Sequence, residues 1–265
     1  MTTVILLGAG NVATHLYKAF STAENISVTQ WYNRTRESIK TYANEVEITD
    51  SLDELKEADL YIMAVSDDSI EQLSKDLPFT NRLVAHTSGS VSMHALDKKN
   101  DIAVFYPLQT FSKDAEITFS EVPICIEAID KDHRKFLKTL ANDLGCKSYK
   151  ISTSQRQSLH LAAVFVNNFT NQLYRIGHEI CESKSVEFEI LKPLIQETAK
   201  KVQEMSPYRA QTGPARRNDK KTIKRQLKLI ENEEHKTIYE VLTDSIKRTH
   251  GFPPTPKRRV KKDQE

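Results

Sequence analysis

The first residues with recognisable chemistry form a short loop near the N-terminus, Gly8-Ala9-Gly10-Asn11-Val12-Ala13. The loop follows the apolar run Val4-Ile5-Leu6-Leu7 and precedes an amphipathic stretch, so it joins a predicted strand to a predicted helix. Gly8 permits a tight turn, Gly10 lets backbone approach a pyrophosphate, and Ala13 lets the helix pack closely on the strand. Free N–H groups at the helix start favour a bound anion. We therefore predict a dinucleotide site formed by Gly8, Ala9, Gly10, Asn11 and Val12.

The end of the second predicted strand indicates which dinucleotide is bound. Sites that prefer NAD place an acidic residue here to hold the ribose hydroxyls, whereas this chain has Asn33-Arg34-Thr35 and no acid before Glu37. Arg34 can pair with a 2′-phosphate, and Asn33 and Thr35 can donate to it. This favours NADP(H) and argues against a methyltransferase with a nucleoside cofactor. The alternative is that Arg34 and Arg36 belong to a solvated loop.

Polar residues also follow the next strands, at the sheet edge where open α/β folds bind ligands. After the fourth strand we expect Val65, Ser66 and Asp67 to line the cofactor and Asp68 to cap a helix. The fifth strand leads into His86-Thr87-Ser88-Gly89-Ser90, from which Ser88 is assigned to the cofactor and His86 to catalysis. The order of these residues does not match the serine-hydrolase motif.

Two further segments supply candidate substrate contacts. Gln109 and Thr110 lie between aromatic residues in the segment 105–112, which suits either a pocket wall or a packed loop. Further along the chain, polar side chains recur on one face of a helical pattern; they are His160, Asn167, Asn168 and Asn171. A buried polar face needs partners, so it either is satisfied in the core or meets substrate.

The elements that would position these residues alternate in the first part of the chain. Short apolar runs predict strands over residues 4–7, 26–32, 47–49, 60–65, 82–86, 102–105, 123–127 and 148–151. Helical patterns between them cover residues 12–20, 36–45, 51–57, 68–77 and 131–144. Helices alone are predicted afterwards, over residues 152–184, 188–205, 220–230 and 235–247. Such a pattern is typical of a Rossmann-type, doubly wound and mostly parallel α/β sheet followed by an all-helical domain.

We accordingly expect an NADP-binding domain over residues 1–152, a helical substrate or dimerisation domain over residues 153–252, and a disordered basic tail over residues 253–265. The net charge of +2 gives no sign of nucleic-acid binding. No apolar run reaches the length of a membrane span, and the three cysteines suit a reducing compartment without suggesting a metal site. These features favour a cytoplasmic protein. In the segment 212–219, Asp219 is expected to cap a helix. Arg216 or Arg217 either holds an anionic group of the substrate or pairs structurally with an acidic residue.

Taken together, these motifs resemble the uncharacterised bacterial proteins that join a Rossmann-like domain to a C-terminal helical domain of unknown function. That family is distantly similar to pyrroline-5-carboxylate reductase, ketopantoate reductase and the deazaflavin-dependent NADP reductases. Its most specific parts here are Leu108-Gln109-Thr110-Phe111 and the pattern from Gly213 to Asp219, which favours Arg217 over Arg216. The resemblance implies NADP binding, an active site between the domains and a helical domain that often dimerises. It implies no particular substrate.

Two functions from different classes follow. The first is an NADP(H)-dependent oxidoreductase that reduces a C=O or C=N bond of a small anionic metabolite. In it, His86 or His160 donates the proton, Asn168 orients the substrate, and Arg217 binds its carboxylate or phosphate. The second is a non-catalytic NADP-binding sensor or regulator, which the lack of a sharp acid–base pair allows. Of the two we favour the reductase, acting as a homodimer.

Overall fold

The computed structural model describes residues 1–113 and 115–254. The tail that we predicted to be disordered from residue 253 therefore lies outside the described residues from residue 255 onward. Contacts divide the chain into two compact units, the first Met1–Asn168 and the second from Phe169 onward. None of the helices within the described ranges is long and apolar enough to cross a membrane.

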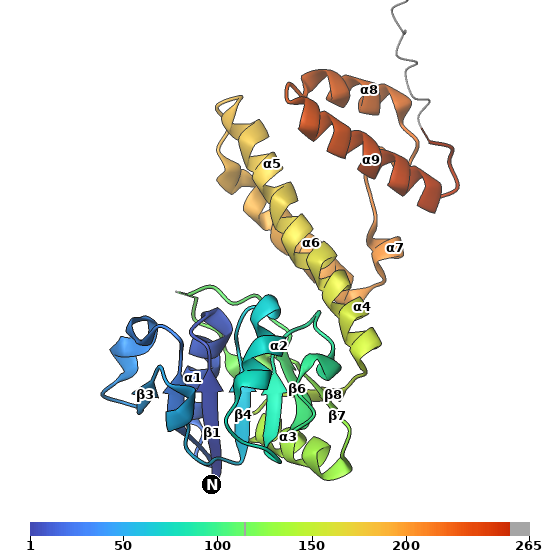
Figure 1. The fold of residues 1–265 in the computed structure, drawn as a ribbon. Helices are drawn as coiled ribbons and strands as arrows, with labels where there is room; N and C mark the ends of the chain where they lie inside the picture. Colours follow the sequence, from blue (N-terminus) through green and yellow to red (C-terminus); the bar gives the residue numbers. More distant parts are fainter. Residues whose placement is uncertain (114, 255–265) are drawn as a thin grey trace, which may run out of the picture. The chain divides into compact units, whose positions relative to one another are not determined.

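The first unit is built on one eight-stranded sheet (Figure 1). The strands are β1 Thr2–Leu7, β2 Ile26–Tyr32, β3 Ile48–Thr49, β4 Leu60–Met63, β5 Leu83–His86, β6 Asp101–Pro107, β7 Ile124–Ala128 and β8 Ser148–Lys150. Their order is β3-β2-β1-β4-β5-β6-β7-β8, and every pair is parallel except the antiparallel pair β6–β7. This confirms the predicted doubly wound, mostly parallel sheet. The strand order reverses between β1 and β4, the place where ligands of such sheets bind.

The apolar run of β1 is buried on both faces of the sheet. Val4 and Leu6 pack into one core with α1 Asn11–Thr22 and α3 Lys131–Asp143. Ile5 and Leu7 pack into the other core, against α2 Asp67–Asp76. Burial on both faces explains why the run Val4–Leu7 contains no polar residue. It also holds the loop after Leu7 rigidly at the edge of the sheet.

Two predicted helices of the first unit are shorter or tighter than expected. Residues 36–45 contain the 3₁₀ helix η1 Arg36–Tyr42, and residues 51–57 contain only the turn η2 Leu52–Glu54. Around η2 the buried side chain of Gln30 bonds to the backbone: its Nε2 donates to the Glu54 carbonyl at 3.0 Å, and its Oε1 accepts from the Lys56 N–H at 2.9 Å. These bonds replace those that a longer helix would make.

The long helix predicted over residues 152–184 is present as three consecutive segments. They are α4 Thr153–Ala163, the π-helix η5 Val164–Phe169 and α5 Thr170–Glu182. Ser152 and Gln155 form a capping box at the start of α4, which explains the sharp beginning of the helix. Periodicity alone did not reveal the π-helix, because an added residue in one turn disturbs the apolar spacing only locally.

The second unit consists of helices joined by short loops. After α5 these are η6 Phe188–Leu191, α6 Lys192–Glu204, α7 Pro207–Ala210, α8 Lys220–Leu229 and α9 Glu233–Thr249. Buried His235 of α9 lies with its Nε2 3.2 Å from Glu179 Oε2 of α5, and the hydroxyl of Tyr239 donates to Gln226 Oε1 at 2.7 Å. These polar contacts connect α9 to α5 and to α8. The helical character of this part of the chain is as predicted.

Candidate functional site

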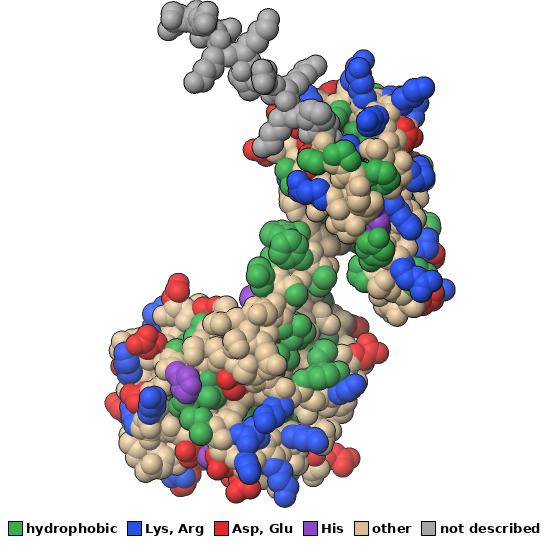
Figure 2. All heavy atoms as spheres, turned by 90° about the vertical axis from the view of Figure 1, so that its right-hand side faces the viewer, with side chains coloured by type: hydrophobic (Ala, Val, Ile, Leu, Met, Phe, Trp, Pro, Cys, Tyr) green, Lys and Arg blue, Asp and Glu red, His purple; other side chains and the backbone are tan. Residues whose placement is uncertain are grey.

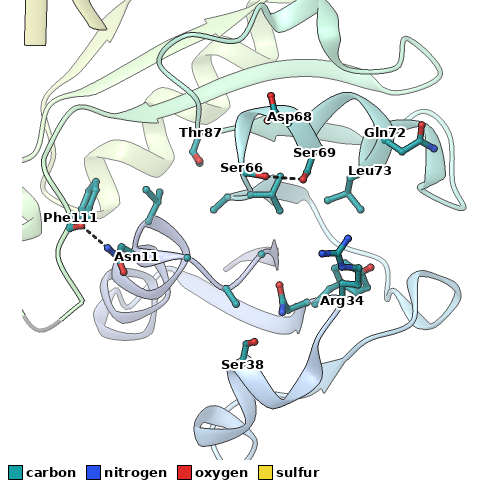
Figure 3. Close-up of a pocket in the computed structure, with 18 of the residues that line it drawn as sticks. Asn11, Arg34, Ser38, Ser66, Asp68, Ser69, Gln72, Leu73, Thr87 and Phe111 are labelled. Atoms are coloured by element: carbon teal, nitrogen blue, oxygen red, sulfur yellow. Dashed lines mark hydrogen bonds between the residues drawn. The ribbon is translucent and has the colours of Figure 1, made fainter. Parts of the chain in front are cut away.

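A cavity in the first unit opens at the carboxyl ends of the strands (Figure 3) and has a volume of about 970 Å³. That volume is at the upper end of the range for small-molecule and cofactor sites. Twelve of the predicted site residues line it: Gly8, Ala9, Gly10, Asn11, Val12, Asn33, Arg34, Val65, Ser66, Gln109, Thr110 and Asn168. These come from the loops after β1, β2, β4 and β6 and from η5.

Gly8 fixes the turn that begins the cavity. Its φ is +117°, and a Cβ on it would lie 2.3 Å from the carbonyl oxygen of Ala64. No other residue fits there without moving backbone. The indole N–H of buried Trp31 donates to the Gly8 carbonyl at 2.6 Å. This hydrogen bond also stabilises the turn.

Gly10 faces open space. If the loop binds a dinucleotide, the pyrophosphate needs such space next to the backbone. A Cβ on Gly10 would meet nothing within 4 Å, although Gly10 lines the cavity. Gly10 is also the N-cap of α1 and supplies no side-chain cap, whereas Asp130 caps α3 and Ser152 caps α4. The first N–H groups of α1 are therefore left for an anion such as a pyrophosphate. The loop fits the group that the sequence predicts.

Arg34 lies at one end of the cavity, with Ser38 of η1 and one face of α2 nearby (Figure 3). The face of α2 is formed by Ser69, Gln72, Leu73 and Asp76, which recur at helical spacing. Sequence reasoning missed these residues, although their spacing on a predicted helix after β4 was a usable signal. The predicted cap at Asp68 is wrong, because the N-cap of α2 is Ser66, whose Oγ lies 2.8 Å from Ser69 Oγ.

The other end of the cavity is bounded by Thr87 and by Phe111 from the loop after β6 (Figure 3). Asn11 Nδ2 donates to the Phe111 carbonyl at 2.8 Å, and His15 Nε2 lies 2.9 Å from the Ser112 carbonyl oxygen. These bonds tie the loop to α1. Gln109 and Thr110 are held in the wall as a consequence, even though both side chains are exposed.

Asn167 and Asn168 reach the same cavity from the π-helix η5. A π-helix has a wider turn than an α-helix and occurs often at functional sites. Asn167 was placed on the polar face of this helix from its sequence spacing, but only Asn168 was assigned a role. No location relative to the cavity follows for Asn171, which lies in the second unit.

Three of the predicted cofactor-binding residues, Thr35, Asp67 and Ser88, make hydrogen bonds to other residues of the protein. Asp67 accepts a hydrogen bond from Ser90 Oγ, and buried Ser88 accepts through its Oγ from the N–H groups of Ser90 at 3.1 Å and Val91 at 3.0 Å. Thr35 receives a bond on its carbonyl from Asn33 Nδ2 at 2.9 Å. These contacts shape the loops after β2 and β5, which line the cavity through Arg34 and Thr87.

His86, one of the two histidines proposed as the proton donor, is completely buried. Its Nδ1 accepts from the Ser88 N–H at 3.1 Å. Burial, together with the nearby positive charge of Arg156, lowers the pKa of His86 to about 4. The ring is therefore neutral at physiological pH, and its complete burial favours a structural role over proton donation.

His160, the other histidine, is half-buried on α4 and pairs with a tyrosine. The hydroxyl of Tyr106 lies 3.1 Å from His160 Nδ1. Gly89 packs against both rings, since a Cβ on it would lie 2.5 Å from His160 Nδ1 and 2.8 Å from Tyr106 Cζ. His160 is not itself in the cavity wall, but Thr87, two residues before Gly89, is.

One turn earlier on α4, a fully buried arginine holds the same loop. Arg156 Nη1 donates to the carbonyls of Ser88 at 2.8 Å and Val91 at 2.7 Å, and its Nη2 pairs with Glu127 Oε2 at 3.1 Å. An arginine in this position resembles a surface residue in the sequence, because its acidic partner is 29 positions away. Sequence reasoning therefore missed it.

The second unit contains the remaining predicted site residue, Arg217, with its side chain exposed. Asp219 caps α8, as predicted, by accepting from the Thr222 N–H at 3.0 Å. Within the described ranges, no group of three or more His, Cys, Asp or Glu side chains is arranged to hold a metal ion.

Comparison with known proteins gives one family match and several similar structures. Residues 122–246 match the model described as "Domain of unknown function (DUF2520)". A search of curated proteins gave no match. A protein from Bacteroides fragilis, described as a "putative NADP oxidoreductase", is 39% identical with a TM-score of 0.82, over 93% of this chain and 98% of that one.

Two more distant structures show the same fold. A protein from Thermotoga maritima is 18% identical with a TM-score of 0.71, over 93% of this chain and 98% of that one. An imine reductase from Myxococcus stipitatus, in complex with NADP+, is 17% identical with a TM-score of 0.61, over 93% of this chain and 92% of that one. At these identities the likeness concerns the fold alone.

Proposed function

This chain belongs to the family of the Bacteroides fragilis protein, and we propose that it is an NADP(H)-dependent oxidoreductase. The observation that carries the proposal is the cavity with the glycine loop and uncapped α1 in its middle and Arg34 at one end. The reaction proposed is reduction of a C=O or C=N bond in a small metabolite.

Different residues of the chain bind different parts of the cofactor. The N–H groups at the start of α1 bind the pyrophosphate next to Gly10, where no side chain intervenes. Arg34 pairs with the 2′-phosphate, and Asn33 lies beside it in the cavity wall. Val65 and Ser66 flank the dinucleotide, and Thr87 lies at the end that would receive the nicotinamide.

When bound, NADPH supplies a hydride to the carbon of the C=O or C=N bond. The heteroatom gains the electron pair of that bond and needs a proton to give the alcohol or amine. We assign this proton to His160, because the ring of His86 is completely buried whereas that of His160 is half-buried. Asn168, Gln109 and Thr110 line the cavity with uncharged hydrogen-bonding groups and orient the substrate. Arg217 remains the proposed partner of an anionic substrate group.

We further propose that the protein is a homodimer formed through its helical unit. Large apolar side chains of that unit are exposed to solvent, as the green areas of Figure 2 illustrate. Ile190 of η6 and Leu194 of α6, four positions apart in the sequence, are 68% and 62% exposed. Large apolar side chains that are exposed in numbers on one part of a protein indicate an interface with another protein.

The experiment is a measurement of NADPH consumption against a panel of cyclic and linear imines, keto acids and aldehydes. We expect at least one class of substrate to be reduced, and His160→Gln to lower kcat about a hundredfold while leaving the affinity for NADPH unchanged. His94→Gln, a change at an exposed histidine of the first unit that does not line the cavity, serves as a control and keeps full activity.

The alternative is a non-catalytic NADP(H) sensor. It is favoured by one observation, that neither His86 nor His160 is in the cavity wall. Tight NADPH binding without turnover of any substrate in the panel would support the sensor and reject the oxidoreductase. In that case NADPH should instead change the oligomeric state or the protease sensitivity of the chain.

A further inference from the structure

Three elements of the first unit bring a tyrosine, a histidine and a glycine into contact. Tyr106 lies in β6, His160 in α4, and Gly89 in the loop after β5. The Tyr106 hydroxyl is 3.1 Å from His160 Nδ1, and the two rings meet edge-on with their planes at 70°. No sequence motif connects these residues, because 54 positions separate the tyrosine from the histidine.

The direction of this hydrogen bond follows from the tyrosine. Tyr106 is 8% exposed, and its burial raises its pKa to about 12. The hydroxyl consequently keeps its proton, and among the described residues His160 Nδ1 is the one acceptor within hydrogen-bond distance of it. A hydrogen on Nδ1 would leave the hydrogen of this buried hydroxyl without a partner. In the neutral histidine only one ring nitrogen carries a hydrogen. If Nδ1 accepts from Tyr106, the hydrogen must be on Nε2.

The surroundings prevent the rings from separating. Gly89 packs directly against the imidazole, since a Cβ there would be 2.5 Å from Nδ1. Arg156, one turn before His160 on the same helix, holds the two ends of this loop through the Ser88 and Val91 carbonyls. The loop, β6 and α4 thus form one rigid support for the imidazole ring.

We propose that Tyr106 is a positioning residue that holds His160 as the Nε2–H tautomer. The ring then presents Nε2–H as its donor, on the nitrogen that Tyr106 does not occupy. Gly89 belongs to the same arrangement, because only glycine leaves space for the contact between Tyr106 and His160. The use of this hydrogen in reducing a substrate rests on the proposed function, whereas the tautomer itself does not.

The test is NMR of the full chain labelled with ¹⁵N in its histidines, recorded without substrate. His160→Gln identifies the His160 signals among the eight histidines. We expect the wild-type protein to show Nε2 protonated and Nδ1 unprotonated. In Tyr106→Phe the two nitrogen frequencies should move toward each other, as the Nδ1–H form becomes populated.

Tyr61→Phe is the matched control, since Tyr61 is also buried and its hydroxyl donates to the Lys56 carbonyl at 2.6 Å, far along the chain from the histidine. It should leave the His160 signals unchanged. A wild-type His160 protonated on Nδ1 would overturn the proposal whether or not the variant folds. Unchanged signals in a folded Tyr106→Phe protein would overturn it too.

Activity separates this proposal from the proposed function. With a substrate in hand, Tyr106→Phe should lower kcat about tenfold, the worth of one good hydrogen bond, with the KM for NADPH unchanged. If the tautomer is as expected but NADPH is never consumed, the positioning role stands and the oxidoreductase fails. If turnover is found with the opposite tautomer, the oxidoreductase stands and the positioning role fails.

Discussion

Arg34 is the residue that most directly links the structure to a choice of cofactor. It lines the cavity, whereas Arg36, two positions further on, does not. We predict that Arg34→Ala raises the Kd for NADPH about tenfold to a hundredfold, the range for a lost hydrogen bond to a charged group. The Kd for NADH should change little. Fluorescence titration measures both constants, and Arg36→Ala should leave both near their wild-type values. An equal loss for the two cofactors would contradict a contact with the 2′-phosphate.

His86 makes the stability of the first unit depend on pH. Its pKa is about 4 in the folded protein and ordinary in the unfolded chain, about 6.5. The unfolded chain therefore binds more protons as the pH falls from about 6.5 to about 4, and stability is lost over this window. We predict that His86 contributes a loss of about 2 kcal/mol between pH 7 and pH 5.

Urea unfolding followed through the fluorescence of Trp31, the single tryptophan, reports on the sheet unit in which His86 lies. His86→Asn should lower stability at pH 7 but remove most of this pH dependence. His94→Asn, a change at an exposed histidine, should retain it. A wild-type protein whose stability is the same at pH 7 and pH 5 would contradict the buried, neutral ring.

At the scale of elements, the loop between β1 and α1 contains two glycines with opposite requirements. Gly8 needs its positive φ and has no room for a Cβ, whereas a Cβ on Gly10 would enter the cavity. We predict that Gly8→Ala destabilises the first unit by about 2 kcal/mol or more. Gly10→Ala should leave the urea midpoint unchanged and weaken NADPH binding. A destabilised Gly10→Ala protein with normal affinity would reverse the assigned roles.

The sequence predicted those elements whose apolar pattern is strong and local. The run 4–7, the glycine spacing and the alternation of strands with helices together led to the sheet and its binding edge. The turn at η2 could not be predicted, because it depends on Gln30, which is 24 positions from its partner Glu54. The π-helix η5 also escaped prediction, since the apolar spacing continues on both sides of it.

Most of the candidate site was predictable because its residues follow strands directly, and Asn168 was found from the polar face of a predicted helix. The loops after β1, β2 and β4 were found in this way. The support formed by Tyr106, Arg156 and Gly89 was not, because each contact joins distant parts of the chain through a buried polar group. Burial also changed the assessment of His86, which in the sequence is indistinguishable from an exposed histidine at the end of a strand.

At the scale of the whole molecule, the exposed apolar residues of the helical unit predict self-association. We expect the full chain to sediment as a dimer, and the double variant Ile190→Glu, Leu194→Glu to sediment as a monomer, because it places charges in an apolar interface. Ile129→Glu is the control, since Ile129 is 67% exposed but lies in the sheet unit. A wild-type monomer at micromolar concentration would contradict the dimer.

The central claim is that the cavity between the ends of β1 and β4 binds NADP(H), and calorimetric titration of the full chain tests it most directly. With NADPH we predict one binding event per chain, at least about tenfold tighter than with NADH, because Arg34 meets a phosphate that NADH lacks. Absence of binding by either dinucleotide, or tighter binding of NADH, would contradict the claim.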